Sequence, residues 1–150
     1  MKPKIIIGAD HAGYKTKEFL KKRLQRRGFL IEDMGTFLKE KVDYPDYAQK
    51  VALAVVKDKT GQTKGILVCG TGIGVCIAAN KIKGIRAAQI YDSYTATRAR
   101  MHNDANVACL RGRKFSAVKA ARFMEIFLNT EFSNEERHKR RIEKIERIKR

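Results

Sequence analysis

The chain has 150 residues, 43% of them hydrophobic and 33% charged, which predicts one packed domain over residues 1–150 and excludes a disordered or fibrous chain. Its formal net charge of +17 comes from Lys and Arg spread along the whole sequence, and such diffuse charge favours a basic surface for small anions over a nucleic-acid groove. The three cysteines are scattered, so we expect a reducing compartment, the cytoplasm, and no disulfides. The apolar runs are too short for a membrane span of roughly 18 residues or for a signal peptide. We therefore expect neither membrane contact nor a nucleic-acid partner.

Short apolar runs alternate with longer amphipathic segments along the chain. Strands are predicted over residues 4–8, 29–33, 65–69, 85–91 and 106–110. Helices are predicted over residues 14–27 with Gly28 at the end, from Pro45 through Val56, over 72–82 and 94–102, from the cap Ser116 through Leu128, and over 134–150. Five strands, each followed by a helix, predict a Rossmann-like three-layer α/β/α fold with a five-stranded parallel sheet. The last helix, with Ile142, Ile145 and Ile148 along one side, is expected to protrude.

Ligands of open parallel sheets bind outside the carboxyl ends of the strands. The first strand leads into Asp10 and His11, and the third leads into Cys69-Gly70-Thr71-Gly72-Ile73-Gly74. We expect Arg113, which follows the fifth strand, and His102, which ends the fourth helix, at the same edge. Two of the three histidines would then lie at the site.

The glycine loop between residues 70 and 74 is suited to an anion, because glycines let backbone N–H groups approach it at a helix N-terminus. The spacing is G-x-G-x-G, with Val75 where a dinucleotide fingerprint has its third glycine, and Asp92 follows about 20 residues on, where such folds carry a ribose-binding acid. A Rossmann-type nucleotide-binding module therefore stays open, as does a loop whose glycines serve only a tight turn.

Cys69 is the strongest candidate for chemistry. A thiol at a strand end that faces a helix N-terminus has a reason to ionise, whereas Cys76 and Cys109 are expected to be buried apolar residues. Asp10 is equally suited to capping, and His102 to the negative end of a helix. Arg137 and Arg141 lie one helical turn apart and form either a phosphate clamp or part of a solvated face.

Together these motifs resemble the type B ribose-5-phosphate isomerases and the related galactose-6-phosphate isomerase subunits. The likeness covers essentially the whole chain, with all blocks in order. The matching segments are Gly8-Ala9-Asp10-His11-Ala12-Gly13, Asp43-Tyr44-Pro45, residues 65–74, Ile77-Ala78-Ala79-Asn80-Lys81, Gly84-Ile85-Arg86-Ala87, residues 102–107, and Arg137-His138 with Arg141.

The resemblance implies an aldose–ketose isomerase of the pentose phosphate pathway that interconverts ribose 5-phosphate and ribulose 5-phosphate. Cys69 would move the proton from C2 to C1 through a cis-enediolate, and some family members replace it with a glutamate where Val75 stands here. The oxyanion would be held by Thr71 and the loop containing Gly70, Gly72 and Gly74. Asp10 and Asn103 would bind sugar oxygens, and His102 would help to open the ring. The phosphate would be held by His11, Arg113, Arg137 and Arg141.

In this family the site lies across a homodimer interface, so the resemblance implies a homodimer or a dimer of dimers in which His102 and Arg113 come from the partner. No cofactor or metal is expected, since the sequence has no convincing ligand cluster. Isomerisation of a 6-phosphorylated hexose, such as allose or galactose 6-phosphate, stays open beside the pentose.

Overall fold

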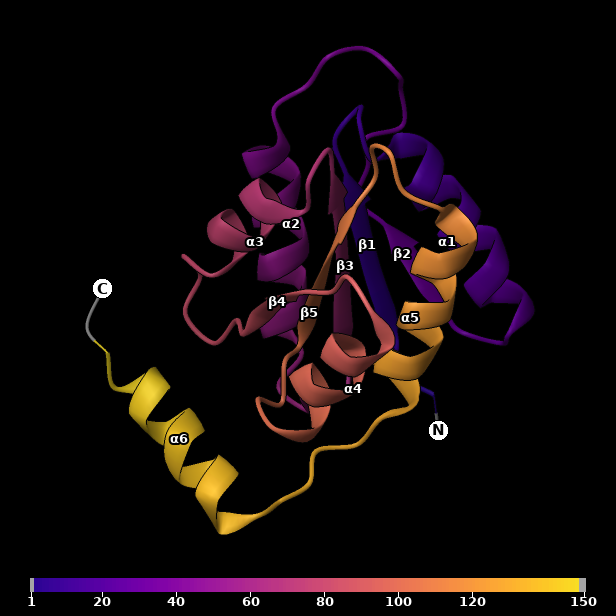
Figure 1. Ribbon diagram of the computed structural model, residues 1–150. Helices are drawn as coiled ribbons and strands as arrows, with labels where there is room; N and C mark the ends of the chain where they lie inside the picture. The colour runs from indigo at the N-terminus through magenta and orange to yellow at the C-terminus, as the bar shows by residue number, and fades with distance from the viewer. Residues whose placement is uncertain (1, 149–150) are drawn as a thin grey trace.

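A computed structural model describes residues 2–148 and gives a sheet of parallel strands with helices on both faces (Figure 1). The elements in chain order are β1 (Ile5–Ala9), α1 (Tyr14–Arg26), β2 (Ile31–Asp33), α2 (Tyr44–Lys57), β3 (Lys64–Cys69), α3 (Ile73–Ala79), β4 (Ala87–Gln89), α4 (Ser93–Met101), β5 (Val107–Arg111), α5 (Ala117–Asn129) and α6 (Glu136–Glu146). No helix among these residues is long and apolar enough to cross a membrane.

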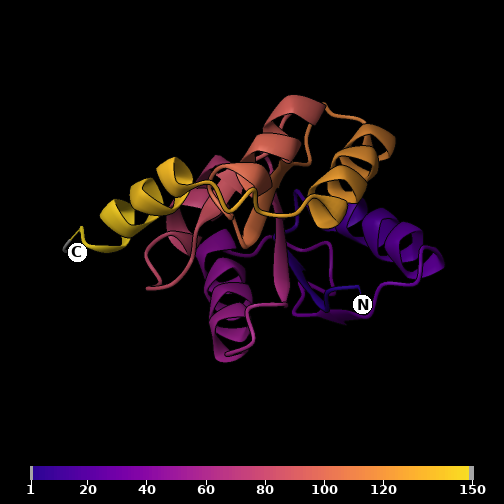
Figure 2. The same ribbon diagram turned by 90° about the horizontal axis from the view of Figure 1, so that it is seen from below.

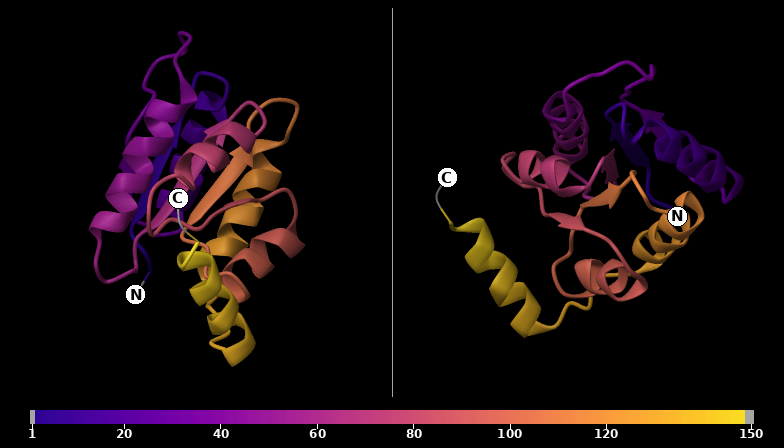
Figure 3. Two further views of the ribbon diagram at one scale, coloured as in Figure 1. Left: turned by 90° about the vertical axis from the view of Figure 1, so that its left-hand side faces the viewer. Right: turned by 45° about the horizontal axis from the view of Figure 1, so that its top comes forward.

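The five strands lie in the order β2-β1-β3-β5-β4, and every neighbouring pair is parallel. Because successive side chains of a strand point to opposite faces, Ile5 and Ile7 pack under α1, α4 and α5, whereas Ile6 packs under α2 and α3. Figure 3 shows these two groups of helices on either side of the sheet. The three-layer α/β/α prediction is therefore confirmed, and β3 and β1 lie at the centre of the sheet, buried throughout.

Strand β2 begins at Ile31 instead of residue 29. Helix α3 and strand β4 are also shorter than predicted, because side chains take over backbone hydrogen bonds. Helix α3 ends at Ala79 instead of residue 82, since the Asn80 amide donates to the Ala87 carbonyl and accepts from the Ala87 N–H, both at 2.9 Å. Strand β4 begins at Ala87 instead of residue 85, since the Arg86 N–H donates to the Asn106 side chain at 2.8 Å. It ends at Gln89 instead of residue 91.

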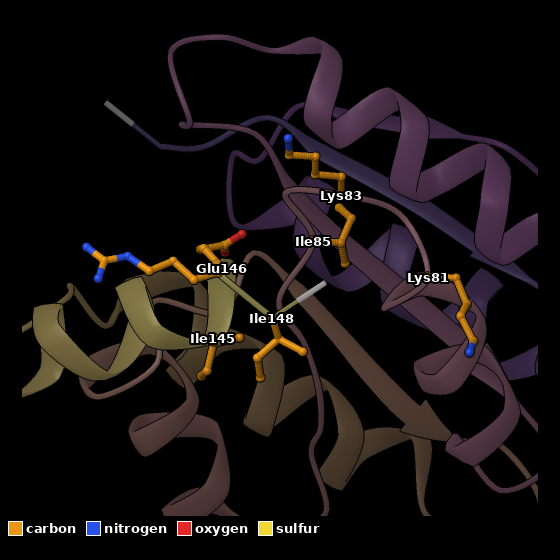
Figure 4. Close-up of a pocket in the computed structure, with 7 residues that line it drawn as sticks. Lys81, Lys83, Ile85, Ile145, Glu146 and Ile148 are labelled. Carbon is orange, nitrogen blue, oxygen red and sulfur yellow. The ribbon is translucent and has the colours of Figure 1, made fainter. Parts of the chain in front are cut away.

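Helix α6 stands apart from the three layers and extends past the β4 side of the sheet (Figure 2). It spans Glu136–Glu146 and not the predicted 134–150, of which residues 149–150 lie outside the described residues. Ile145 of α6 and Ile148, just beyond the end of the helix, line a hollow of about 410 Å³ together with Ile85 (Figure 4). Ile145 and Ile148 nevertheless remain 46% and 68% exposed.

The central strands should carry much of the stability. Leu110 of β5 is fully buried, whereas Leu30 before β2 is 69% exposed. We expect Leu110→Ala to lower the free energy of unfolding by about 2 to 5 kcal/mol, through lost burial and the cavity left behind. Leu30→Ala, the control, should change it by less than about 1 kcal/mol. Urea denaturation followed by circular dichroism measures both, and equal losses would contradict this description of the core.

Candidate active site

Cys69 is the last residue of β3 and points into the apolar layer under α2 and α3. Its side chain is only 4% exposed, and its Sγ accepts a hydrogen bond from the Gly72 N–H at 3.2 Å. A backbone donor aimed at the sulfur gives a thiolate the kind of partner that a charged acceptor needs. Cys69 therefore lies under the glycine loop, as predicted, at the carboxyl edge of the sheet.

The glycine loop holds its shape through close packing. Gly72 has a left-handed φ of +78°, and a Cβ there would lie 2.8 Å from the Leu110 carbonyl carbon of β5. A Cβ at Gly74 would lie too close to the Tyr44 ring, so this position also excludes a side chain. The Thr71 hydroxyl accepts from the Ile73 N–H at 3.2 Å, and Thr71 itself is exposed. The loop thus presents Thr71 and its backbone to solvent directly above the sulfur.

Asp10 and His11 follow β1, next to β3, and so share this edge. Asp10 is 5% exposed, and its carboxylate accepts from the Gly13 N–H at 3.0 Å. The His11 Nδ1 lies 3.2 Å from the Val42 backbone. The chain before Val42 is fixed in turn, because Ala9 exchanges hydrogen bonds with Gly35 and Thr36. The capping alternative for Asp10 is therefore partly true, and one carboxylate oxygen remains for a ligand.

Arg113 lies at the same edge as Cys69. Its N–H donates to the Gly70 carbonyl at 3.1 Å, and its side chain runs close over Gly70. A cavity of about 520 Å³ opens here, and its polar and cationic lining includes Thr71, Gln89, Arg111, Arg113 and Lys114. Arg111 is part of the segment that follows the fifth strand in the sequence, but neither it nor Lys114 nor Gln89 was predicted as a site residue. The Gln89 amide donates to the Thr71 carbonyl at 2.8 Å.

His102 and Asn103 do not lie at this edge, and the expectation that they do is wrong. Helix α4 runs back from the end of β4, so its last turn reaches the opposite, amino edge. There the Asn103 carbonyl accepts from the Arg86 guanidinium at 3.0 Å, and Asn106 bonds Gly65 at the start of β3. Since β3 has six residues, the two edges are about 17 Å apart. The structure thus separates His102 from Arg113, which the family resemblance had grouped together.

His138, which sequence reasoning noted but did not place in the site, stacks on His102. Their ring centroids are 4.2 Å apart; His138 is 2% exposed, and its Nδ1 lies 2.7 Å from the Ser133 hydroxyl. Burial lowers the pKa of His102, and the nearby His138, Arg98 and Arg137 lower it further. His102 is therefore biased toward the neutral form. The only sequence signal was the position of His138 between two arginines.

Arg137 and Arg141 both lie on α6, and Arg137 is close enough to act on the charge of His102. Both are exposed, and the Arg137 Nε donates to the Glu135 carboxylate at 2.7 Å. This amino-edge group of His102, Asn103, His138, Arg137 and Arg141 is called the α4–α6 half-site below. The carboxyl-edge group of Asp10, His11, Cys69, the glycine loop and Arg113 is called the Cys69 half-site.

The remaining candidates have structural roles. Burial raises the pKa of the Cys109 thiol, and a hydrogen bond with Cys109 lowers the pKa of Cys76. Asp92 caps α4 by accepting from the Thr95 N–H at 2.6 Å, which argues against a ribose-binding role. Val75 is fully buried. Within residues 2–148, His, Cys, Asp and Glu form no group of three suited to a metal ion.

Known proteins resemble this chain over most of its length. The family described as Ribose/Galactose Isomerase matches residues 5–145. A ribose-5-P isomerase B from Listeria innocua is 46% identical over 87% of this chain and 86% of its own. A ribose 5-phosphate isomerase structure from Thermotoga maritima is 44% identical, with a TM-score of 0.92 over 97% of this chain and 99% of that one.

A ribose-5-phosphate isomerase B structure from Mycoplasma genitalium, with bound ribulose-5-phosphate, is 41% identical and has a TM-score of 0.91. It covers 96% of this chain and 94% of that one. The family match spans residues 5–145, which contain the whole sheet and the residues of both half-sites. The chain therefore belongs to the Ribose/Galactose Isomerase family.

Proposed function

We propose that this protein interconverts ribose 5-phosphate and ribulose 5-phosphate without a metal or cofactor. The observation that carries the proposal is the Cys69 sulfur under the glycine loop, within reach of the Gly72 N–H. The relatives from Listeria innocua and Escherichia coli, 46% and 40% identical, are named as ribose-5-phosphate isomerases, which favours the pentose over a 6-phosphorylated hexose. The family match over residues 5–145 supports a single-domain enzyme. The three cysteines, an odd number and all free, support the cytoplasm as its compartment.

The geometry supplies the groups that proton transfer next to a carbonyl requires. The Cys69 thiolate takes the proton from C2 while the carbonyl oxygen at C1 becomes an enediolate oxygen. The Thr71 hydroxyl and loop N–H groups stabilise that oxygen. The thiol then returns the proton to C1, the C2 hydroxyl passes its proton to the C1 oxygen, and the C2 oxygen becomes the ketose carbonyl. Asp10 binds sugar hydroxyls, and His102 opens the ring.

We further propose that the complete site forms between two copies of the chain. The Cys69 half-site lacks His102, Asn103 and the α6 arginines, because these lie about 17 Å away at the other edge of the same sheet. A two-fold axis that places the α4–α6 half-site of one copy against the Cys69 half-site of the other completes both sites at once. The exposed Ile145 and Ile148 support such an association.

In this arrangement the phosphate meets cations from both halves. His11 and Arg113 approach it from the Cys69 half-site, and Arg137 and Arg141 from the partner's α4–α6 half-site. Arg137 already has a carboxylate partner in Glu135, and a phosphate dianion would compete for its remaining donors. Remote phosphate binding of this kind positions C1 and C2 over the sulfur.

The direct test is conversion of ribose 5-phosphate by purified protein, compared with allose and galactose 6-phosphates. Cys69→Ala should lower kcat by at least about a thousandfold, because no other described group lies where it takes the C2 proton. Cys76→Ala, the matched control from α3, should retain activity within about twofold. A Cys69→Ala variant as active as the parent would remove Cys69 as the base.

Subunit mixing tests the shared site. Cys69→Ala and His102→Ala should each be inactive alone, and unfolding and refolding them together should restore about a quarter of the parent activity. Half of the mixed dimers are then heterodimers, and each of these holds one intact site out of two. No recovery, with dimers present by light scattering, would show that each site is built within one chain.

The glycine loop can be tested with two glycines of similar φ. Gly72→Ala forces a Cβ against Leu110 and moves the N–H away from the Cys69 sulfur. Displacements near 1 Å cost about a hundredfold in rate, so kcat should fall by that order. Gly61, with φ +71° and open space around it, makes Gly61→Ala the control for backbone strain alone. Equal activity of the two variants would contradict the role of the Gly72 N–H.

A further inference from the structure

We propose that Arg98 is a positioning residue that holds His102 neutral, with its proton on Nδ1, and that the isomerase uses this state to open the sugar ring. The inference rests on the proposed function for the role of His102, and on the geometry of α4 and α6 for its state. Arg98 belongs to none of the motifs that define the family resemblance, and sequence reasoning gave it no role.

The contact itself fixes the tautomer. Arg98 lies one helical turn before His102 on α4, and its Nη1 is 3.4 Å from the His102 Nε2. A guanidinium only donates hydrogen bonds and does not lose its proton in proteins. Nε2 must therefore accept in this contact, so the imidazole proton lies on Nδ1.

The charge of Arg98 is not balanced by a carboxylate. The neighbouring arginines are paired: Arg86 and Arg100 with Asp104, and Arg137 with Glu135. Arg98 instead lies over the Tyr94 ring at 5.1 Å and near the Met101 sulfur at 3.8 Å. Its Nε is buried without a hydrogen-bond partner in residues 2–148, and no carboxylate there lies within 4 Å of its nitrogens. Among the described residues, no carboxylate therefore offsets the effect of its charge on His102.

The other groups around His102 act mostly in the same direction. From α6, His138 stacks on the ring and Arg137 adds a second cation, whereas Glu135, just before α6, and the end of α4 favour the imidazolium. Burial and these charges lower the pKa of His102 below its ordinary value. The imidazole therefore stays neutral into mildly acidic solution, and its Nε2 lone pair remains available.

A neutral imidazole suits ring opening. The C1 hydroxyl of the furanose replaces Arg98 at Nε2, since a 3.4 Å contact is long and weak. Its proton moves to Nε2 as the C1 carbonyl forms and the bond from C1 to the ring oxygen breaks. The imidazolium, repelled by Arg98, then gives the same proton to the ring oxygen, and His102 returns to neutral. Atoms and charge balance without another reactant.

Nuclear magnetic resonance of the imidazole nitrogens measures the state directly, with the His102 signals assigned by their loss in His102→Gln. We expect Nδ1 to carry the proton in the parent protein. In Arg98→Met the titration midpoint of His102 should rise by about 0.5 to 1 pH unit, as expected for losing a unit charge near 4 Å. Arg98→Lys should fall between the two, and Arg122→Met, an exposed arginine of α5, should leave the midpoint unchanged.

A proton on Nε2, or a midpoint unmoved in Arg98→Met, would overturn the proposal. These readouts need no turnover, so they stand even if the isomerase assignment fails. With ribose 5-phosphate, the acidic limb of kcat/KM should move to higher pH by the same amount in Arg98→Met, because the neutral form is the active one. If the titration midpoint of His102 shifts in Arg98→Met but the acidic limb of kcat/KM does not move, catalysis does not use neutral His102.

Discussion

The direction of the strands decides where every functional group of this protein lies. In a parallel sheet, residues that follow strands gather at the carboxyl edge, and residues that end the crossover helices gather at the amino edge. Asp10, Cys69 and Arg113 belong to the first class, and His102 with Asn103 belongs to the second. The height of the sheet keeps the two classes apart within one copy. A site that needs residues of both classes therefore has to form between two copies of the chain, as proposed above.

The α4–α6 half-site depends on a set of ion pairs. Asp104, held at a φ of +44° just after His102, accepts from Arg86 at 2.9 Å and from Arg100 at 2.7 Å. Arg86 also bonds Glu146 near the end of α6, and Arg100 bonds the Thr130 carbonyl after α5. One carboxylate thus connects the turn after α4 to β4, while its arginine partners reach α6 and the end of α5. Partial burial makes such pairs stronger than exposed ones.

Much of the fold could be predicted because its strongest signals are local. The apolar run of β3, the stripe of α2 and the caps Gly28 and Ser116 gave elements whose ends match within a residue or two. The predictions failed where a distant side chain replaces a backbone partner, as Asn80 and Asn106 do around β4. Periodicity carries no information about such contacts.

The positions of the candidate site residues in the fold were predicted only in part. Cys69 and its loop follow from the strand-then-glycine pattern, and their placement is as expected. His102 was placed at the wrong edge, although the direction of a crossover helix already determines where its last turn lies. Tertiary contacts such as the His102–His138 stack and the Arg98 contact join residues whose spacing alone suggests no chemistry.

The stacking of His138 on His102 also sets an order of events during synthesis. Once the chain has emerged from the ribosome through Asn129, all five strands and their covering helices are outside, so the sheet and the Cys69 half-site have what they need to form. His102 then still lacks its ring partner, because Ser133 and His138 emerge later. The half of the site proposed to serve a second copy is therefore completed after the sheet and the Cys69 half-site.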